Sequence, residues 1–258
     1  MHRKNCRTPA ATKEVQAMGK GIGELKEKTL HASLKNYLQP DQAKQEVKCC
    51  GYVADILDGN RITEVQTRNF YAMKDKLRCF LDNGNDVTVV YPVTRVKWLI
   101  WIDQTSGDMT KKRKSPKTGV PQEIFYELYS LRELLPHERL HFRICMVDAE
   151  EYRNLNGWSR DKKRGSTRAE RIPVAIDSWI SLDTPEDFSG MLPDTLKDPF
   201  EAKELAAVCR ISRTLAARGL SVLLKLGVIE RTGKRGRAYL YGRKPASSAN
   251  SSAQTVNA

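Results

Sequence analysis

The pattern of apolar and polar positions divides residues 23–152 into segments typical of helices and strands. Helices are predicted over residues 23–38, 69–82 and 120–135, and strands over 46–50, 86–93, 96–103 and 141–152, with a hairpin between 51 and 70. Leu30, Leu34 and Leu38 share one stripe of the first helix, which ends before Pro40. The order α-β-β-β-α-β-β-α-β predicts an α/β fold with helices packed on one mixed sheet.

The hairpin is predicted by the turn-forming residues 58–60, Asp-Gly-Asn, between two β-rich runs. A loop of two or four residues centred there pairs Ile56 with Thr63 and Asp55 with Glu64. Residues directly opposite on one face have Cβ atoms roughly 4.5–5.5 Å apart, so these two carboxylates repel each other. A hard divalent cation such as Mg²⁺ prefers carboxylate oxygens and would turn the repulsion into binding.

Other loop lengths change this geometry. A loop at residues 58–59 leaves Asp55 and Glu64 on one face but diagonal, and a three-residue loop with a bulge sends them to opposite faces. In that case both acids would be solvated strand residues. Apolar neighbours on both strands favour a central position in the sheet, where acids are rare. Gln66, two residues after Glu64, adds a neutral polar group to the same face.

Composition narrows the class of protein and of partner. The chain has 258 residues, enough for one sizeable core and a small second domain. It contains no signal-peptide pattern and no apolar run approaching the length of a membrane span, so a cytoplasmic protein is expected. The six cysteines include no C-x-x-C pair, which argues against a zinc site. The net charge of +13 fits an anionic polymer as partner, nucleic acid before an acidic membrane.

Two segments concentrate positive charge without apolar anchors, residues 111–117 and 159–171. Such segments are either solvated loops or phosphate contacts. The second contains Arg160, Lys162, Lys163, Arg164, Arg168 and Arg171. We expect Lys112, Arg113 and Lys114 of the first to contact DNA.

The C-terminal part differs in composition from the rest. Residues 1–20 and 244–258 are predicted to be disordered tails, 21–182 one domain, 183–198 a linker and 199–243 a separate module. The module's pattern of helix, turn, longer helix and basic hairpin resembles a winged helix-turn-helix. The resemblance implies DNA contacts by residues of the second helix and of the hairpin, namely Arg213, Arg218, Lys225, Lys234, Arg235 and Arg237. A winged helix that binds protein is the alternative.

Residues 24–150 resemble the PD-(D/E)xK nuclease superfamily, whose pattern is a Glu on the first helix, a strand Asp, and acid-x-Lys on the next strand. Glu27, Asp55 and the run Glu64-Val65-Gln66 match it, with Gln66 in place of the Lys. The resemblance implies a restriction-endonuclease-like core that binds Mg²⁺ or Mn²⁺ through Asp55, Glu64 and the Val65 carbonyl. Gln66 would then orient the attacking water, and Glu27 would act through the water shell of the metal.

The function expected from these features is metal-dependent hydrolysis of duplex or branched DNA, with the C-terminal module as the targeting unit. The missing Lys favours one alternative, a catalytically inactive, nuclease-like DNA-binding regulator or assembly factor. Lys74, one turn into the second helix, is a candidate to supply the missing ammonium, although a solvated helix face is the simpler interpretation. An RNA-processing enzyme is less favoured, because no aromatic RNA-binding motif is present. Monomer and homodimer are both compatible with the sequence.

Overall fold

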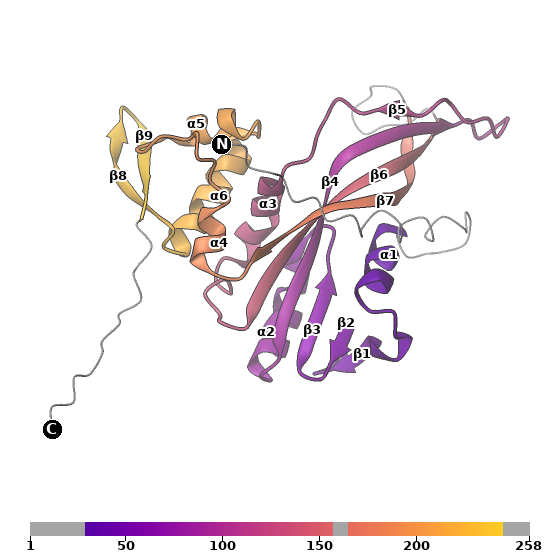
Figure 1. The fold of residues 1–258 in the computed structure, drawn as a ribbon, viewed down its shortest axis with the longest axis horizontal. Helices are drawn as coiled ribbons and strands as arrows, with labels where there is room; N and C mark the ends of the chain where they lie inside the picture. Colours follow the sequence, from indigo (N-terminus) through magenta and orange to yellow (C-terminus); the bar gives the residue numbers. More distant parts are fainter. Residues whose placement is uncertain (1–28, 157–164, 245–258) are drawn as a thin grey trace, which may run out of the picture.

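One mixed sheet organises the part of the chain that the computed structural model describes, residues 29–156 and 165–244 (Figure 1). The strands are β1 (Gln45–Cys49), β2 (Tyr52–Asp58), β3 (Arg61–Val65), β4 (Asp86–Ile102), β5 (Arg113–Lys114), β6 (Leu140–Asn154) and β7 (Thr167–Leu182). Their order is β1-β2-β3-β4-β6-β7, with the short β5 also paired to β4. The pairs β3-β4 and β4-β6 are parallel and the others antiparallel. The predicted α/β fold is confirmed.

Helices cover both faces of this sheet. Helix α1 (Thr29–Leu38) packs Leu30 and Leu34 on Val65 and Val90 of one face. The other face is covered by the 3₁₀ turn η3 (Phe70–Met73), α2 (Lys74–Asp82), η4 (Pro121–Ile124), α3 (Phe125–Leu128) and η5 (Tyr129–Leu131). Strand β4 is therefore buried on both sides along its first half, as its nearly continuous apolar run predicts.

The β2-β3 hairpin has the predicted register. Asp58 pairs with Arg61, so the loop is the two-residue Gly59-Asn60, and Ile56 pairs with Thr63. Gly59 has a φ of 64°, in the left-handed region that glycine adopts without steric cost. Local turn chemistry thus sets which residues of the two strands face each other.

Two strand predictions were wrong. Residues 86–93 and 96–103 form one strand, β4, because a register shift against β6 between Thr94 and Lys97 absorbs the polar interruption. Residues 167–171, expected in a basic loop, begin strand β7. The charge of Arg171 is accommodated there because its guanidinium donates to the carboxylate of Glu151 on the neighbouring strand.

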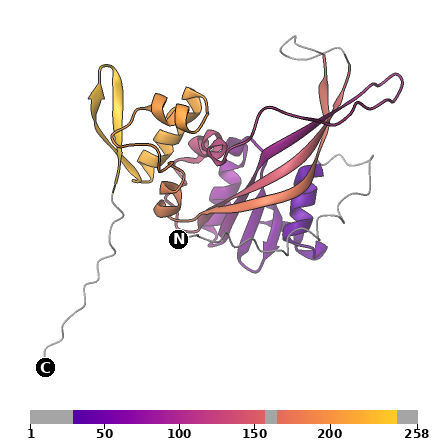
Figure 2. The ribbon, with the colours of Figure 1, turned by 45° about the horizontal axis from the view of Figure 1, so that its top comes forward.

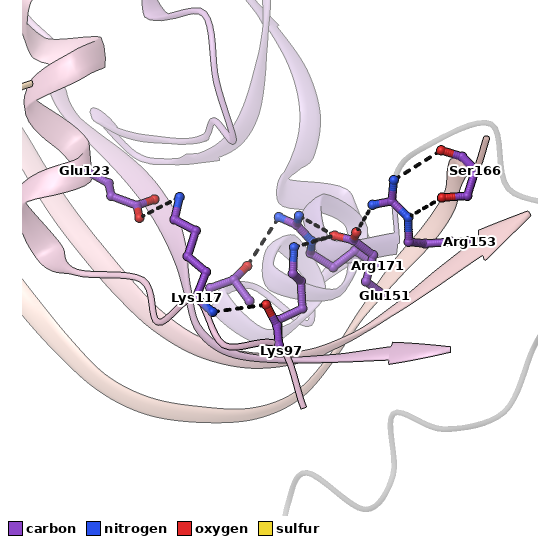
Figure 3. Close-up of polar contacts among 9 residues, drawn as sticks. Lys97, Lys117, Glu123, Glu151, Arg153, Ser166 and Arg171 are labelled. Atoms are coloured by element: carbon purple, nitrogen blue, oxygen red, sulfur yellow. Dashed lines mark hydrogen bonds and ion pairs between the residues drawn. The ribbon is translucent and has the colours of Figure 1, made fainter. Parts of the chain in front are cut away.

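The long strands β4, β6 and β7 continue beyond the helices as a twisted arm (Figures 1 and 2). Glu151 lies within the arm with only 2% of its side chain exposed. Figure 3 shows Lys97, Arg153 and Arg171 converging on it, with nitrogen-to-oxygen distances of 3.3, 2.7 and 2.7 Å. Burial opposes ionisation of Glu151, but the hydrogen bond from Arg171 and the charges of Lys97 and Arg171 outweigh it and lower its pKa to about 2.

Residues 183–198 are not a linker. They contain helix α4 (Pro185–Ser189), which begins with a capping box between Thr184 and Asp187. Four apolar side chains that follow or belong to this helix are buried in the main core, namely Phe188, Met191, Leu192 and Leu196. The Asp, Pro and Thr content that suggests a linker instead supplies helix caps and turns.

The C-terminal unit has the predicted order of elements. It consists of α5 (Ala202–Val208), α6 (Arg213–Lys225) and a hairpin of β8 (Ile229–Arg235) and β9 (Ala238–Arg243). Its core is continuous with the core of the sheet, because α6 packs against α3. No helix in the described ranges is both long and apolar enough to cross a bilayer.

The contact between α6 and α3 depends on Gly219. A Cβ atom at this position would lie 2.8 Å from Cδ2 of the buried Phe125. In a free helix, Gly→Ala stabilises by about 1 kcal/mol. Here we expect Gly219→Ala to lower the free energy of unfolding by about 1–3 kcal/mol through overpacking. Thermal unfolding measures it, with Ser221→Ala on the same helix as the control. A rise in the free energy of unfolding of both variants would contradict the close packing of α6 on α3 at Gly219.

Candidate functional site

Asp55 and Glu64 lie together where strands β2 and β3 separate. The regular pairing of the strands ends at Ile56 and Thr63. Beyond it each carboxylate reaches across to the other strand: Glu64 Oε1 accepts from the Asp55 backbone N–H at 3.1 Å, and Asp55 Oδ2 accepts from the Val65 N–H at 2.8 Å. The side chains of the two acids thus replace the next rung of the ladder and hold each other in place.

Two further side chains bind this carboxylate pair, one from each face of the sheet. Lys76 of α2 donates to Glu64 Oε2 at 2.5 Å, and His31 of α1 lies with Nε2 3.1 Å from Asp55 Oδ2. The side chains of Lys76 and His31 are 19% and 21% exposed, so the site is partly open to solvent. The sequence-based search for the site included neither residue.

The surroundings shift the pKa values of the two carboxyl groups in opposite directions. Burial and the neighbouring Asp55 charge raise the pKa of Glu64 to about 7, despite the ammonium of Lys76. Burial also opposes ionisation of Asp55, but the hydrogen bond and charge of His31, the Val65 N–H and Lys76 together hold its pKa below the usual range. Two acids in contact with opposite pKa shifts are typical of functional sites.

The oxygens at this site are suitable for a hard cation. Asp55 Oδ2 is taken by His31 and Val65, whereas Oδ1 receives no hydrogen bond from any residue in the described ranges. The Val65 N–H points toward β2, and in an extended strand the carbonyl of the same residue points to the same side. Asp55 Oδ1 and the Val65 carbonyl are oxygen atoms of the kind that Mg²⁺ or Mn²⁺ prefers, whereas both Glu64 oxygens already accept hydrogen bonds, from the Asp55 N–H and from Lys76. A set of three or more His, Cys, Asp or Glu side chains placed to hold a metal does not occur among the described residues.

The other predicted members of the site have different positions. The amide of Gln66 is turned back onto its own chain, where Nε2 donates to the Arg68 carbonyl at 2.7 Å. Glu27 lies outside the described residues. Lys74, the lysine considered for the ammonium, has no contact with the carboxylates, and Lys76 lies there instead.

The sequence does contain a signal for Lys76. On a helical wheel it lies 60° from Met73 and 40° from Phe80, two buried residues of the apolar stripe. A cation at the border of a buried stripe needs an anionic partner. Lys74 lies at the opposite border of the same stripe, 20° from Leu81, so the wheel alone does not choose between the two lysines, and the structure places Lys76 at Glu64.

The residues of α6 that were expected to contact DNA divide into two groups. Arg218 lies 3.8 Å from the centroid of the Tyr126 ring, and Lys225 pairs with Glu133 at 3.3 Å, so both bind the body of the protein. Arg213 is exposed and free of hydrogen bonds and ion pairs within the described ranges. Arg218 packs on the body of the protein because its face of α6 contacts α3 and η5, whereas Lys225 stays exposed while it pairs with Glu133, and DNA contact by either residue stays a prediction.

The hairpin residues also divide. Arg235 bonds to Glu201 and Glu204 at 3.1 Å each, which ties the hairpin to α5. Lys234 lies over the Tyr239 ring and stays exposed. Arg237 occupies the exposed tip of the hairpin, and no ion pair holds it in the part of the chain that is described.

The first basic segment lies on the arm. Lys112 pairs with Glu150 at 2.5 Å and lies over the Trp98 ring, whereas Arg113 and Lys114 are exposed on β5. Of the second basic segment, Arg160, Lys162, Lys163 and Arg164 lie outside the described residues. Arg168 begins β7, where burial lowers its pKa and the nearby Arg171 and Arg68 charges add to the effect.

Comparisons with known proteins add a family. An uncharacterized protein of Treponema pallidum (strain Nichols) is 29% identical over 232 residues, covering 87% of this chain and 88% of the relative. No solved structure matches. A family model described as "Domain of unknown function (DUF8091)" matches residues 28–183, the span from α1 to the end of β7 that contains both carboxylates. Since this match extends over more than half of the sequence, the chain belongs to the family described as Domain of unknown function (DUF8091).

Proposed function

We propose that the protein is a metal-dependent DNA endonuclease of the PD-(D/E)xK type, in which the lysine of the motif has been replaced by one from a helix. The observation that supports this most directly is the position of Lys76, whose ammonium lies 2.5 Å from Glu64 of the paired carboxylates. Gln66 at the usual lysine position then does not argue against activity, because the positive charge comes from α2.

In this proposal each side chain has a defined role. Asp55 Oδ1, Glu64 and the Val65 carbonyl would hold Mg²⁺ or Mn²⁺, which polarises the scissile phosphate and lowers the pKa of an attacking water. His31 fixes the orientation of Asp55 by occupying Oδ2. Lys76 stabilises the negative charge that grows on the phosphate oxygens. Gln66 has no direct role in our proposal, because its amide is bound to the Arg68 carbonyl.

The C-terminal unit would target this site to DNA as a winged helix-turn-helix. Its order of elements and the exposed cations Arg213, Lys234 and Arg237 support this assignment. Arg113 and Lys114 on the arm would contact phosphates away from the cut. The net charge of +13 supports a polyanionic partner, and DNA in a cytoplasmic setting is the substrate we infer.

A nicking assay tests the proposed activity. Wild-type protein incubated with supercoiled plasmid or branched DNA is expected to cut in Mg²⁺ or Mn²⁺ and not in EDTA. Asp55→Asn and Glu64→Gln should each lower the rate by at least about 100-fold. Titration calorimetry with Mn²⁺ gives a second readout, in which Asp55→Asn should lose the binding heat. If both single variants cut DNA at the wild-type rate, Asp55 and Glu64 are not the site of the reaction.

DNA binding is tested separately from cutting. Arg213→Ala and Arg237→Ala should each weaken duplex binding in EDTA and reduce the salt slope of log affinity by about 1, because each removes one phosphate contact. Arg235→Ala is the matched control, since its guanidinium is bound to Glu201 and Glu204. Fluorescence anisotropy at several salt concentrations measures this. An unchanged slope in the first two variants would indicate a protein-binding unit.

One observation favours a second function, a nuclease-like DNA-binding regulator without activity. Both oxygens of Glu64 are engaged by protein donors, Asp55 N–H and Lys76. If this closed arrangement persists in Mn²⁺, metal binding and nicking would both be absent while duplex binding remains. The two assays above distinguish this outcome from the enzyme.

A further inference from the structure

A second polar site lies where the C-terminal unit meets the sheet domain. It is a pocket of about 450 Å³, within the about 300–1,000 Å³ range of small-molecule sites. Residues after β3, from α3 and η5, and from α6 line it. We call it the tyrosine pocket and define it by Arg68, Tyr71, Tyr126, Glu127, Tyr129 and Arg218.

Glu127 gives the pocket a buried hydrogen-bond acceptor. The residue is only 9% exposed, and its Oε2 accepts from the Phe70 backbone N–H at 2.9 Å. That contact fixes the carboxylate at the start of η3. Its other oxygen, Oε1, accepts no hydrogen bond from the described residues. Oε1 is also not one of the fully buried polar atoms that lack a partner, so part of its surface is accessible. A buried carboxylate with one free oxygen selects a ligand that donates a hydrogen bond.

The remaining lining is aromatic and cationic. Tyr71 and Tyr126 are 71% and 54% exposed, which is unusual for large aromatic side chains. The Arg218 guanidinium lies 3.8 Å from the centroid of the Tyr126 ring and 5.5 Å from that of Tyr129. Aromatic rings and guanidinium planes stack with nucleobases, at about 1–3 kcal/mol per base. Arg68 is exposed and has no ion pair with any other described residue, so its charge suits a phosphate.

The pocket is close to the proposed catalytic carboxylates. Arg68 follows Glu64 by four residues, so their Cα atoms are at most about 14 Å apart. The two are also connected through Gln66, whose amide donates to the Arg68 carbonyl. Each strand of B-DNA advances about 3.4 Å per nucleotide, so the pocket lies within about four nucleotides of a phosphate held at Asp55 and Glu64.

We propose that the tyrosine pocket holds an unpaired base of the DNA strand that is cut, and that it selects bases with an exocyclic amino group. The inference rests on the proposed endonuclease function and adds its substrate class: DNA with an unpaired base near the cut. Adenine, cytosine and guanine each direct an amino N–H to a carboxylate oxygen, whereas the N3–H of thymine is flanked by two carbonyl oxygens that a carboxylate repels. The base stacks on Tyr71, and Arg68 contacts the neighbouring phosphate.

Binding of short single strands in EDTA tests the pocket without requiring cutting. Fluorescein-labelled hexamers of deoxycytidine and deoxyadenosine should bind about tenfold more tightly than the deoxythymidine hexamer. Tyr71→Ala should lower the affinity of the first two by about tenfold. Tyr37→Ala, which removes an exposed tyrosine on α1, is the control and should have no effect. Free deoxycytidine monophosphate should compete weakly, because it lacks the contacts of the flanking strand.

Glu127→Gln is the sharpest variant. Its amide oxygen can keep the contact with the Phe70 N–H, so that an NH₂ donor replaces the free acceptor in the pocket. We expect the preference to shift from cytosine to thymine, with unfolding midpoints checked to exclude misfolding. Equal binding of all hexamers by wild type, an unchanged preference in Glu127→Gln, or monophosphate binding as tight as the hexamer would overturn the inference. The binding assays are done in EDTA without metal, so they test the pocket even if the protein fails to nick DNA.

Discussion

Replacing Lys76 by methionine is expected to lower the rate of DNA nicking by about 100- to 1,000-fold, the usual effect of removing one preorganised charge from a transition state. The ammonium of Lys76 donates to Glu64 at 2.5 Å. Its charge favours the ionised forms of both Asp55 and Glu64, although burial and the Asp55 charge keep the pKa of Glu64 raised. Methionine keeps the length and apolar contacts of the side chain, so the effect of the lost charge is isolated. Initial nicking rates at saturating DNA measure it, and duplex affinity in EDTA should be unchanged.

A double variant makes this prediction specific. Adding Gln66→Lys to Lys76→Met restores a lysine at the strand position of the superfamily motif, and we expect it to recover at least about tenfold of the lost rate. Lys74→Met is the matched control on the same helix, because Lys74 does not reach the carboxylates. Equal loss of rate in Lys74→Met, or full activity in Lys76→Met, would exclude the proposed role of Lys76.

Replacing Glu151 by glutamine is expected to destabilise the protein by about 3 kcal/mol, because Lys97, Arg153 and Arg171 lose their shared counter-ion inside the arm. The difference between the ordinary pKa of 4.5 and the folded value of about 2 gives the same magnitude, since each pKa unit corresponds to about 1.4 kcal/mol. A loss of this size lowers the thermal midpoint by about 6–12 °C in a protein of this length.

The pH dependence of this effect has a defined sign. The folded-state pKa of Glu151 is depressed, so its contribution is fully present above the unfolded pKa of about 4.5 and is lost as the pH falls toward about 2. The difference in unfolding free energy between wild type and Glu151→Gln should be constant from about pH 5 to 8 and shrink below about 4.5. Glu150→Gln, the neighbour paired with the exposed Lys112, should cost less than about 1 kcal/mol. A similar loss of unfolding free energy in Glu151→Gln and Glu150→Gln would contradict the stabilising role of the three cations around Glu151.

Local patterns predicted a large part of the fold. The Asp-Gly-Asn turn set the register of the β2-β3 hairpin, which the observed pairing of Ile56 with Thr63 confirms. The order of elements in the C-terminal unit was also predictable, because α6 shows a helical period of apolar residues and the polar, glycine-containing run at residues 232–237 indicates a hairpin tip. Strand β7 was not predicted, because the charge of Arg171 is balanced only by a residue 20 positions away.

Functional residues with distant partners were harder to find. Arg218 has the spacing of a DNA-reading residue on the second helix, but it binds a tyrosine 92 positions earlier in the chain. Glu127 occupies the apolar stripe of the segment that contains Ile124 and Leu131, a signal that the sequence offers for a buried acid. The stripe does not reveal that the partner is the Phe70 N–H, or that a pocket opens beside it.

The sequence by itself determined the register of the β2-β3 hairpin, because two residues of turn chemistry dictate the pairing of adjacent strands, but the ladder ends at Ile56 and Thr63, so the predicted direct pair of Asp55 and Glu64 does not form. Only the tertiary structure decided what surrounds them. Lys76 and His31 come from helices on opposite faces of the sheet, and which helical side chain reaches a site depends on how each helix packs. The packing of α6 on α3 likewise decided which cations remain free, since a helix has one face to bury and its charges follow that choice.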